Sequence, residues 1–598
     1  MATGLPGIQS VTIVDGSLGL VPTNTTGIST KVGACSLGVP NQIYSFTSVQ
    51  DVQSTLGTGK LVSAISDALD ISGGPIYAVK TSTSVAGTFS AVQYQLQTTP
   101  VASDGVLALT GSVPLDDYIG IVKCVRSGKV GTSPYPTFTY SLDNGLTFSA
   151  EIVIPIGGVY VIPKTGVTLT FTSGANGMFT NDTWYFTTTA ATWNNSDVST
   201  AFTALLADSR AWGFAHLVGV CDTTIATTVA AFMASAQTNE RYVHTIVEVR
   251  DMNMIASLAS TANTFPMTFT GGETLRIDIS NDFGASYSTS TTFTFTATAY
   301  ANIAALVAAL NVQSFTKGLF TVTAVSNTLV LSTLSIKGQI ALKVNAASTA
   351  IGGGFIQYTA NQTGQGELED AWIAALITAW TPFVSDRVAV FAGTADIYSS
   401  APGSYDIRPG SWLMSGREGL VPIQEDLGYV GRGPLPFILP PDLTNGRYGV
   451  YHDEQLKPGL DAARFCTLRS FHGLPGFYIT NGRTMATPGS DFTYIQNRRV
   501  IDQAATLLDI VAKQFINMQV RVNSNGTIYP IDAGGIEDKC STFLYAGLKD
   551  NVVSITVKVD RTINVLSTQT LKITCSILPF GYTKYINLVV GFTPIITT

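Results

Sequence analysis

The sequence predicts an α/β (α+β) fold whose core is assembled from discontinuous segments, with two inserted all-β domains and strand-donating arms at both ends. Three observations lead to this prediction. Helical and strand patterns alternate in several separated stretches, β-rich stretches with turn signals interrupt them twice, and period-two apolar runs lie near both termini. A chain of 598 residues has room for about four domains, each with its own apolar core.

The predicted division follows these changes of pattern. It consists of an N-terminal arm (1–20), core segments (21–81, 196–263 and 366–496), two β-rich inserts (82–195 and 264–365), a C-terminal core domain (497–584) and a C-terminal arm (585–598).

The core segments carry the α/β alternation. Residues 51–72 place apolar residues at helical spacing, and Gly73-Gly74 ends this helix before a strand at 75–80. The same order returns later, and Pro382 stops the last helix. The later elements are helices at 196–208, 224–236 and 368–380 and strands at 213–220, 242–249 and 387–391.

The two inserts show short alternating runs separated by turn residues. In the first, Asp143-Asn144-Gly145 lies between the runs 137–140 and 146–148, which predicts a hairpin. In the second, residues 291–298 and 319–331 are strand-like, and 303–310 has a short helical pattern between them.

The C-terminal part predicts helices and then strands. Residues 501–517 form a long amphipathic pattern, 541–548 a shorter one, and period-two runs follow at 553–559, 571–577 and 586–592. An edge strand offers unpaired N–H and C=O groups that a neighbouring chain can satisfy, so terminal strands are candidates for exchange between subunits. The candidate residues are Val11, Ile13, Ile586, Leu588, Val590 and Phe592. The alternative, that these strands complete their own chain's sheet, stays open.

Composition limits the function classes. Only 12% of residues are charged, the net charge is -7, the pI is near 5.2 and the mean hydropathy is +0.27. This composition predicts a surface that contacts other proteins and lacks the clustered basic residues that bind nucleic acid. No apolar run is long enough for direct membrane insertion, and the opening Met-Ala-Thr-Gly-Leu-Pro-Gly lacks the pattern of a secretion signal. Six scattered cysteines predict reduced, mostly buried thiols without zinc or redox spacing.

Chemical motifs are weak, and we predict no enzyme, no catalytic residue, no cofactor and no metal site. Gly57-Thr58-Gly59-Lys60 resembles the end of a phosphate loop, but Ser54 and Leu61 break the motif, which favours a turn. His216 and His244 lie in apolar strands, which favours satisfied core histidines. His452-Asp453-Glu454 favours a solvated loop or a subunit contact, because adjacent residues rarely face one ion.

One stretch of the chain resembles a known family. Its pieces are Tyr448-Gly-Val-Tyr-His-Asp-Glu-Gln455, Leu460-Asp461-Ala462-Ala463-Arg464-Phe465, residues 473–482, Ser490-Asp491-Phe492 and Arg498-Arg499-Val500. Together with Gly4-Leu-Pro-Gly7 and Gly33-Ala-Cys-Ser-Leu-Gly38, their order resembles the contractile-tail sheath proteins of bacteriophages. The resemblance covers most of the chain outside the two inserts, which the smallest members of the family lack.

The resemblance implies a structural subunit that polymerises helically, as stacked rings or a multistart helix, around a tail tube. It implies exchange of terminal strands, contraction from a metastable extended state that drives the tube through the host envelope, and contacts with tube, baseplate and tail-terminator proteins. It also implies a place in the virion after assembly in the host bacterial cytoplasm.

Two alternatives stay open. A non-contracting virion protein, such as a tube, decoration or adhesin subunit, would account for the β-rich inserts and the low charge. An enzyme acting on cell-wall polymer would need paired carboxylates in a cleft, and Glu367-Leu368-Glu369-Asp370 is more typical of a helix N-terminus.

Overall fold

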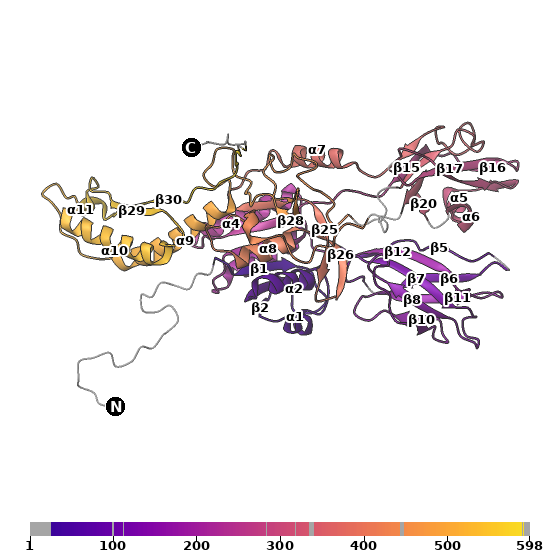
Figure 1. Ribbon diagram of the computed structural model, residues 1–598, viewed down its shortest axis with the longest axis horizontal. Helices are drawn as coiled ribbons and strands as arrows, with labels where there is room; N and C mark the ends of the chain where they lie inside the picture. Colours follow the sequence, from indigo (N-terminus) through magenta and orange to yellow (C-terminus); the bar gives the residue numbers. More distant parts are fainter. Residues whose placement is uncertain are drawn as a thin grey trace, which may run out of the picture.

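A computed structural model describes residues 26–98, 101–111, 113–282, 284–316, 319–333, 340–442, 448–588 and 590. It is elongated, with a central α/β body, a helical C-terminal part at one end and two β-rich regions at the other (Figure 1). The prediction of a mixed α/β structure is confirmed. The division of the chain into domains remains a prediction.

The central sheet draws its strands from separated parts of the chain. Its order is β2-β3-β1-β13-β14-β24, with parallel pairing except between β2 and β3. The strands are β1 (Ser29–Gly33), β2 (Ile43–Phe46), β3 (Ile76–Lys80), β13 (Phe214–Val220), β14 (His244–Glu248) and β24 (Val388–Phe391). Parallel strands buried on both faces read as continuous apolar runs, which explains why 213–220 and 242–249 could be recognised.

Helices cover both faces of this sheet. One face packs against α3 (Asn195–Ala207), α4 (Thr223–Thr238) and α7 (Glu369–Trp380). The other packs against α1 (Val49–Leu56), α2 (Lys60–Ser72) and α8 (Ser411–Leu420). The helix expected over 51–72 is two helices, because Gly57 and Gly59 adopt positive φ angles of 74° and 122° between them.

Further elements complete the body beside β24. They are the hairpins β25 (Thr394–Ser399) with β26 (Ser404–Pro409) and β27 (Leu468–Phe471) with β28 (Leu474–Ile479), and the short helix η1 (Val430–Arg432). Their apolar residues pack with α8 against Phe214 and Ile246 of the sheet.

The first β-rich region lies between β3 and α3 in the sequence and has its own apolar core. Its sheets are β10-β11-β6 and β4-β12-β7-β8-β9, and β5 also pairs with β12. The strands are β4 (Thr88–Phe89), β5 (Gln93–Gln95), β6 (Gly105–Thr110), β7 (Ile119–Arg126), β8 (Thr137–Ser141), β9 (Ile152–Val153), β10 (Val159–Val161), β11 (Thr168–Ser173) and β12 (Thr183–Thr189).

The hairpin predicted around Asp143 is half right. Asn144 and Gly145 form the expected turn with positive φ angles, but residues 146–148 form no strand. The Asp143 carboxylate accepts hydrogen bonds from the backbone N–H and the hydroxyl of Thr147, so this segment folds back as a compact loop. The strand β8 pairs with β7 and β9 instead.

The second β-rich region lies between β14 and α7 in the sequence and has a separate, aromatic-rich core. The expected strand at 319–331 is a hairpin that turns at Ser326, and the expected helix over 303–310 is present. The elements are β15 (Ser257–Ala262), β16 (Met267–Phe269), β17 (Thr274–Ser280), β18 (Thr289–Thr294), β19 (Thr298–Tyr300), α5 (Ile303–Leu310), α6 (Gln313–Thr316), β20 (Phe320–Val325), β21 (Thr328–Thr333), β22 (Ala341–Val344) and β23 (Thr363–Gly364).

The C-terminal part has one apolar core between two long helices and a hairpin. Its elements are α9 (Ile495–Ala512), η3 (Lys513–Phe515), α10 (Pro530–Leu548), β29 (Ser554–Val559), α11 (Val565–Thr568) and β30 (Ile573–Leu578). The strands match the predicted runs at 553–559 and 571–577. The helix expected over 541–548 begins earlier, at Pro530, which suits the first turn of a helix.

Candidate subunit-interface site

The chain after β30 is fastened to the body at two side chains. The hydroxyl of Tyr582 donates a hydrogen bond to the backbone carbonyl of Gln424 at 2.6 Å, and burial raises the pKa of Tyr582 to about 12. The ammonium of Lys584 contacts the Asp426 carboxylate and donates to the side-chain oxygen of Asn481 at 2.6 Å. These contacts fix the point from which the last residues leave the body.

Beyond this anchor, the described part of the C-terminal arm has no helix or strand and little contact with the body. Ile586 is 72% exposed, Leu588 83% and Val590 94%. In an extended backbone, alternate residues point to the same side, so the three side chains would form one apolar row. An exposed apolar row of this kind is typical of a surface that another chain covers.

The hairpin β29–β30 is a candidate acceptor for such a row. Its two strands pair with each other, and neither pairs with a third strand within the described residues. On the face toward α10, Val557 and Val559 are buried, whereas Ile555, Ile573 and Ile577 are only half-buried. A two-stranded sheet is marginally stable alone, so an added strand would both satisfy a free edge and cover these side chains.

The structure places three of the six predicted exchange residues and leaves their role untested. Ile586, Leu588 and Val590 lie in the exposed arm, and the strand expected for 586–592 is not formed in the described residues of the single chain. An isolated edge segment lacks the partner that supplies its ladder hydrogen bonds. Val11, Ile13 and Phe592 lie outside the described residues.

The anchor that positions this arm was not predicted from the sequence. Lys584 and Asp426 are separated by 158 residues, and no local pattern joins them. The one available signal was the apolar alternation that begins at Ile586.

The two strand histidines are satisfied core residues, as predicted. His216 Nε2 lies 2.8 Å from Glu248 Oε1, and its Nδ1 lies 2.9 Å from Lys31 Nζ. Burial, together with the nearby Lys31, lowers the pKa of His216 to about 4, and burial lowers the pKa of Lys31 to about 7. His244 Nε2 lies 2.7 Å from Glu418. This network joins the sheet to α8 and has no access to solvent.

The interpretation of residues 452–454 as a solvated loop is wrong. His452, Asp453 and Glu454 are all buried, and His452 lies 2.9 Å from Glu369 and 3.0 Å from Glu454. Although burial opposes the charge, the hydrogen bonds to Glu369 and Glu454 raise the pKa of His452. His452 therefore fastens the start of α7 to the body. Within the described residues, no group of three or more ligand-type side chains could hold a metal ion.

We expect His452→Gln to destabilise the protein more in mild acid than in mild alkali. A raised histidine pKa contributes stability that is full below the unfolded pKa of about 6.5 and is lost as the pH rises through the folded pKa. The loss should reach about 1.5–3 kcal/mol below pH ~6, the range for hydrogen bonds to a charged group, measured by urea unfolding. The exposed His472, changed to Gln, is the control. Equal losses of unfolding free energy at acid and alkaline pH would contradict a charged His452 in the folded protein.

The glycine motif at residues 57–60 is a turn between helices. Gly57 ends α1, Gly59 precedes α2, and Lys60 forms an ion pair with Asp117 at 2.6 Å. This ion pair therefore links the first β-rich region, which contains Asp117, to the body. All six cysteines are free thiols, five of them buried, as expected for small apolar residues.

No helix among the described residues is long and apolar enough to cross a membrane.

Comparisons with known proteins give a match to part of one family model and several matching solved structures. The model of the family described as DUF2586, N-terminal domain, matches residues 5–270, less than half of the chain. No curated protein matches the sequence significantly.

Three solved structures illustrate the similarity. The sheath tail protein of Listeria innocua is 10% identical with a TM-score of 0.39, covering 94% of this chain and 93% of that one. The sheath tail protein of Desulfitobacterium hafniense is 12% identical with a TM-score of 0.37, covering 96% and 100%. A baseplate chain of the anti-feeding prophage is 10% identical with a TM-score of 0.40, covering all of both chains.

Proposed function

We propose that this chain is a structural subunit of a contractile tail sheath that polymerises helically around a tail tube. The observation that carries the proposal is the anchored, exposed apolar arm at Ile586, Leu588 and Val590, on the same chain as the hairpin β29–β30, which no third strand of the described residues extends. A donor and an acceptor on different parts of one molecule make a heterologous contact, which generates open helical assemblies when the rotation does not close.

In this proposal, the arm of one subunit adds as a strand to the hairpin of its neighbour. Main-chain hydrogen bonds hold the two chains together, and alternate apolar side chains set the register. The chain on either side of the anchor at Lys584 would let the subunit bodies rotate while the exchanged strands stay paired. Val11 and Ile13 would act in the same way at the other terminus.

Contraction requires that the extended assembly be metastable. A baseplate trigger would release subunits from the extended into a wider, shorter arrangement of lower free energy and drive the tube through the host envelope. We propose that this energy is stored in subunit contacts and that the chain has no enzymatic role. Partners would be further copies of the chain, the tube protein, and baseplate and tail-terminator proteins, in a virion assembled in the host cytoplasm.

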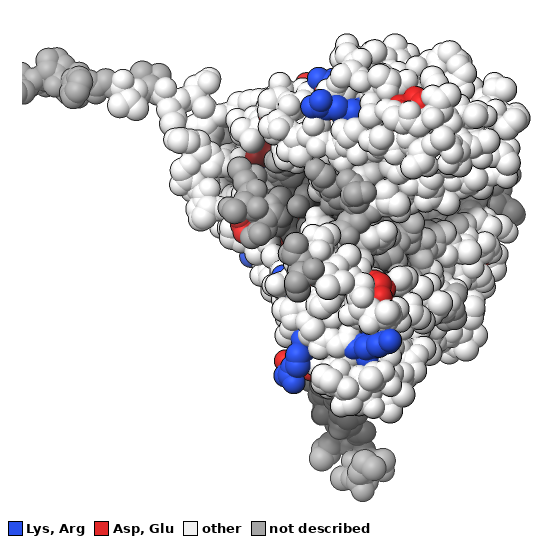
Figure 2. Space-filling model, turned by 90° about the vertical axis from the view of Figure 1, so that its right-hand side faces the viewer, with Lys and Arg blue, Asp and Glu red and all other residues white. Residues whose placement is uncertain are grey.

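We further propose that the α/β body and C-terminal helices face the tube and that the two inserted β-rich domains project outward. The two β-rich regions lie together at one end of the molecule, and α10 and the hairpin β29–β30 lie at the opposite end (Figure 1). Figure 2 views this end and shows few charged side chains on it. Such domains would tolerate the relative rotation of the bodies because each has its own core.

Limited proteolysis of assembled tubes tests this orientation. We expect the first cuts to fall within 82–195 or 264–365, because outward loops are accessible whereas the body is covered by tube and neighbours. Mass spectrometry of the early fragments locates the cuts, and the unassembled chain is the control. Early cuts in α9 or α10 of the assembled form would overturn the placement.

The non-contracting alternative differs in one measurable respect. A decoration or adhesin subunit would bind a pre-formed virion, so loss of either arm would leave any tubular assembly unchanged.

A further inference from the structure

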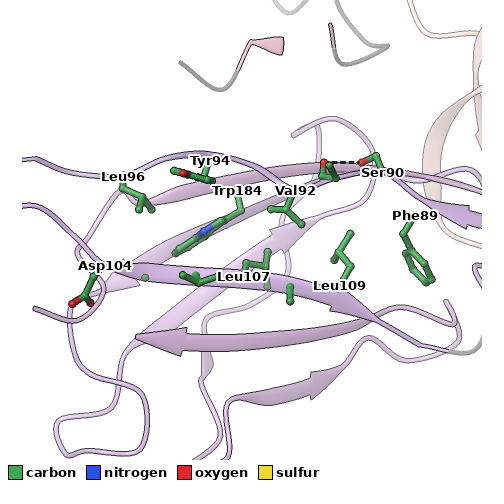
Figure 3. Close-up of a pocket in the computed structure, with 13 residues that line it drawn as sticks. Phe89, Ser90, Val92, Tyr94, Leu96, Asp104, Leu107, Leu109 and Trp184 are labelled. Carbon is green, nitrogen blue, oxygen red and sulfur yellow. Dashed lines mark hydrogen bonds between the residues drawn. The ribbon is translucent and has the colours of Figure 1, made fainter. Parts of the chain in front are cut away.

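Two features of the molecule lie outside the proposed sheath contacts. The first is a groove of the first β-rich region, between β6 and the strands β4 and β5, whose lining is mainly apolar and includes Leu107 and Leu109 (Figure 3). The carboxylate of Asp104 at one end of the groove already accepts three backbone N–H groups, so it is not free to bind a ligand. The second is Lys31 of β1, which is enclosed in the body without a counter-charge in contact.

Lys31 lies on β1, between β3 and β13, and is fully buried. Its terminal nitrogen forms no ion pair with a carboxylate in the part of the chain that the structure describes. His216 of β13 touches it, and the charged groups that face it are Glu248 of β14, Asp67 of α2 and Glu418 of α8. Burial of a charge without a paired partner is costly, so such a group gives up its proton more readily than in water.

The hydrogen bonds on the sheet side of Lys31 fix the direction of donation. Glu248 accepts from Trp412 Nε1 at 2.7 Å, and His216 Nε2 lies 2.8 Å from the same carboxylate oxygen, so His216 donates through Nε2. In a neutral imidazole the other nitrogen is then an acceptor. Lys31 Nζ donates to this Nδ1 at 2.9 Å.

The hydrogen bond on the helix side completes the set. The hydroxyl of Ser415 donates to the carbonyl of Trp412 at 2.8 Å, so its oxygen accepts from Lys31. Lys31 therefore has two acceptors. The two hydrogens of a neutral amine satisfy both, whereas an ammonium group would carry a third hydrogen without an acceptor among the described residues.

A close helix contact beside Lys31 keeps solvent away from it. Gly416 of α8 follows Ser415, and a methyl group placed on its Cα would lie 3.0 Å from Ile71 and 3.2 Å from Ala68 of α2. Because the two helices meet so closely, water reaches the Lys31 nitrogen only when α8 moves away from α2 and β1.

The helix α8 leads directly into the anchor of the C-terminal arm. It ends at Leu420, and Gln424 and Asp426, which bind Tyr582 and Lys584, follow shortly after it. A displacement of α8 would therefore move the point from which the arm leaves the body.

We propose that Lys31 is a proton-sensitive latch that holds α8 against β1 and α2, uncharged when the helix is seated and protonated when the helix is displaced. Uptake of a proton from solvent would weaken the hold on α8 and on the arm anchor. Burial lowers the pKa of Lys31 to about 7, although Glu248, Asp67 and Glu418 act against this shift. The latch does not depend on the sheath role, whereas its effect on strand exchange rests on the proposed function.

The pH window of the latch is separate from that of the groups around it. Lysine has an ordinary pKa of 10.5, so folding releases a proton between pH ~7 and ~10.5, and the hold on α8 strengthens as the pH rises through this window. Burial raises the pKa of Asp67 to about 7, and its effect on stability is complete above that pH. The pKa of His216 is about 4, and histidine neighbours lower the pKa of Glu248 and Glu418 although burial opposes this.

Hydrogen exchange of the unassembled full-length chain, measured by mass spectrometry at pH 7.5, 8.25 and 9, tests the latch. After correction for intrinsic exchange rates, we expect the protection of residues 411–420 to rise about tenfold per pH unit, because closing α8 releases one proton. Residues 421–428 should follow. Lys31→Met keeps the apolar stem but removes the titrating group, so protection of α8 should be the same at each pH.

Lys80→Met is the matched control. Lys80 lies on the neighbouring strand β3 and donates to the backbone carbonyl of Gly38 at 3.2 Å from a part-buried position, so this variant should keep the tenfold rise. The helix α5 has no titratable residue and provides a reference within the unchanged chain, which decides the matter even where Lys31→Met does not fold. Level protection of α8 in the unchanged chain, an equal rise in Lys31→Met, or an equal rise in α5 would overturn the latch. None of these outcomes depends on whether the chain forms tubes.

Discussion

We expect that replacing Ile586, Leu588 and Val590 together with serine abolishes self-assembly of the purified chain and leaves the monomer as stable as before. The three side chains are 72%, 83% and 94% exposed, so they contribute little to the fold of their own subunit. Buried at an interface, each would supply about 1.5–3 kcal/mol. Their loss together costs about 5 kcal/mol or more, which raises the dissociation constant more than ~1,000-fold.

Sedimentation velocity at several protein concentrations measures this effect, and the melting temperature of the monomer reports its fold. The matched control is Asn587→Ser, because residue 587 points to the opposite side of an extended arm from Ile586 and Leu588. We expect this variant to assemble normally. Assembly of the triple variant at the same concentration as the unchanged chain would remove the arm from the interface.

The second large effect is expected at the junction between the first β-rich region and the body. Arg408 of β26 donates to both carboxylate oxygens of Asp116 at 2.7 and 2.6 Å and contacts Asp406 at 3.2 Å. The Arg408 and Asp116 side chains are 3% and 6% exposed. Burial works against the charge, but Asp116 and Asp406 outweigh it and raise the pKa of Arg408.

Arg408→Ala should lower the free energy of unfolding by about 3–5 kcal/mol, because it leaves two buried carboxylates without their counter-charge. Urea unfolding followed by tryptophan fluorescence measures the loss. Arg126→Ala is the control: its ion pair with Glu151 lies in the same region but is 70% and 39% exposed, and should contribute at most ~1 kcal/mol. Equal small losses in both variants would show that Arg408 does not hold the region in place.

Local patterns predicted most regular elements well. The apolar run at 213–220 became β13, and the helical pattern at 303–310 became α5 within its stated bounds. Such elements follow from side-chain periodicity, which is a property of neighbouring residues. The helix expected over 541–548 shows where tertiary contacts outweigh the local pattern. Gly534 and Gly535 weaken a helix, but Ala533 and Ile536 pack in the C-terminal core, and α10 therefore begins at Pro530.

The interface site was only partly predictable for the same reason. The alternation of Ile586, Leu588 and Val590 is visible in the sequence. The anchor, however, joins Lys584 to Asp426, 158 positions away, and the junction to the first β-rich region joins Arg408 to Asp116, 292 positions away. The sequence of His452-Asp453-Glu454 favoured a solvated loop or a subunit contact because adjacent residues rarely face one ion, yet His452 is buried between Glu369 and Glu454. Partners that lie far away in the sequence compensate these buried charges, so a local sequence pattern cannot predict them.

Negative-stain electron microscopy of the full chain at high concentration, beside forms lacking residues 1–14 or 585–598, tests the sheath proposal most directly. We predict hollow striated tubes from the full chain and folded, unassembled subunits from each truncated form. Tubes of unchanged appearance from both truncated forms would contradict assembly through exchanged terminal strands.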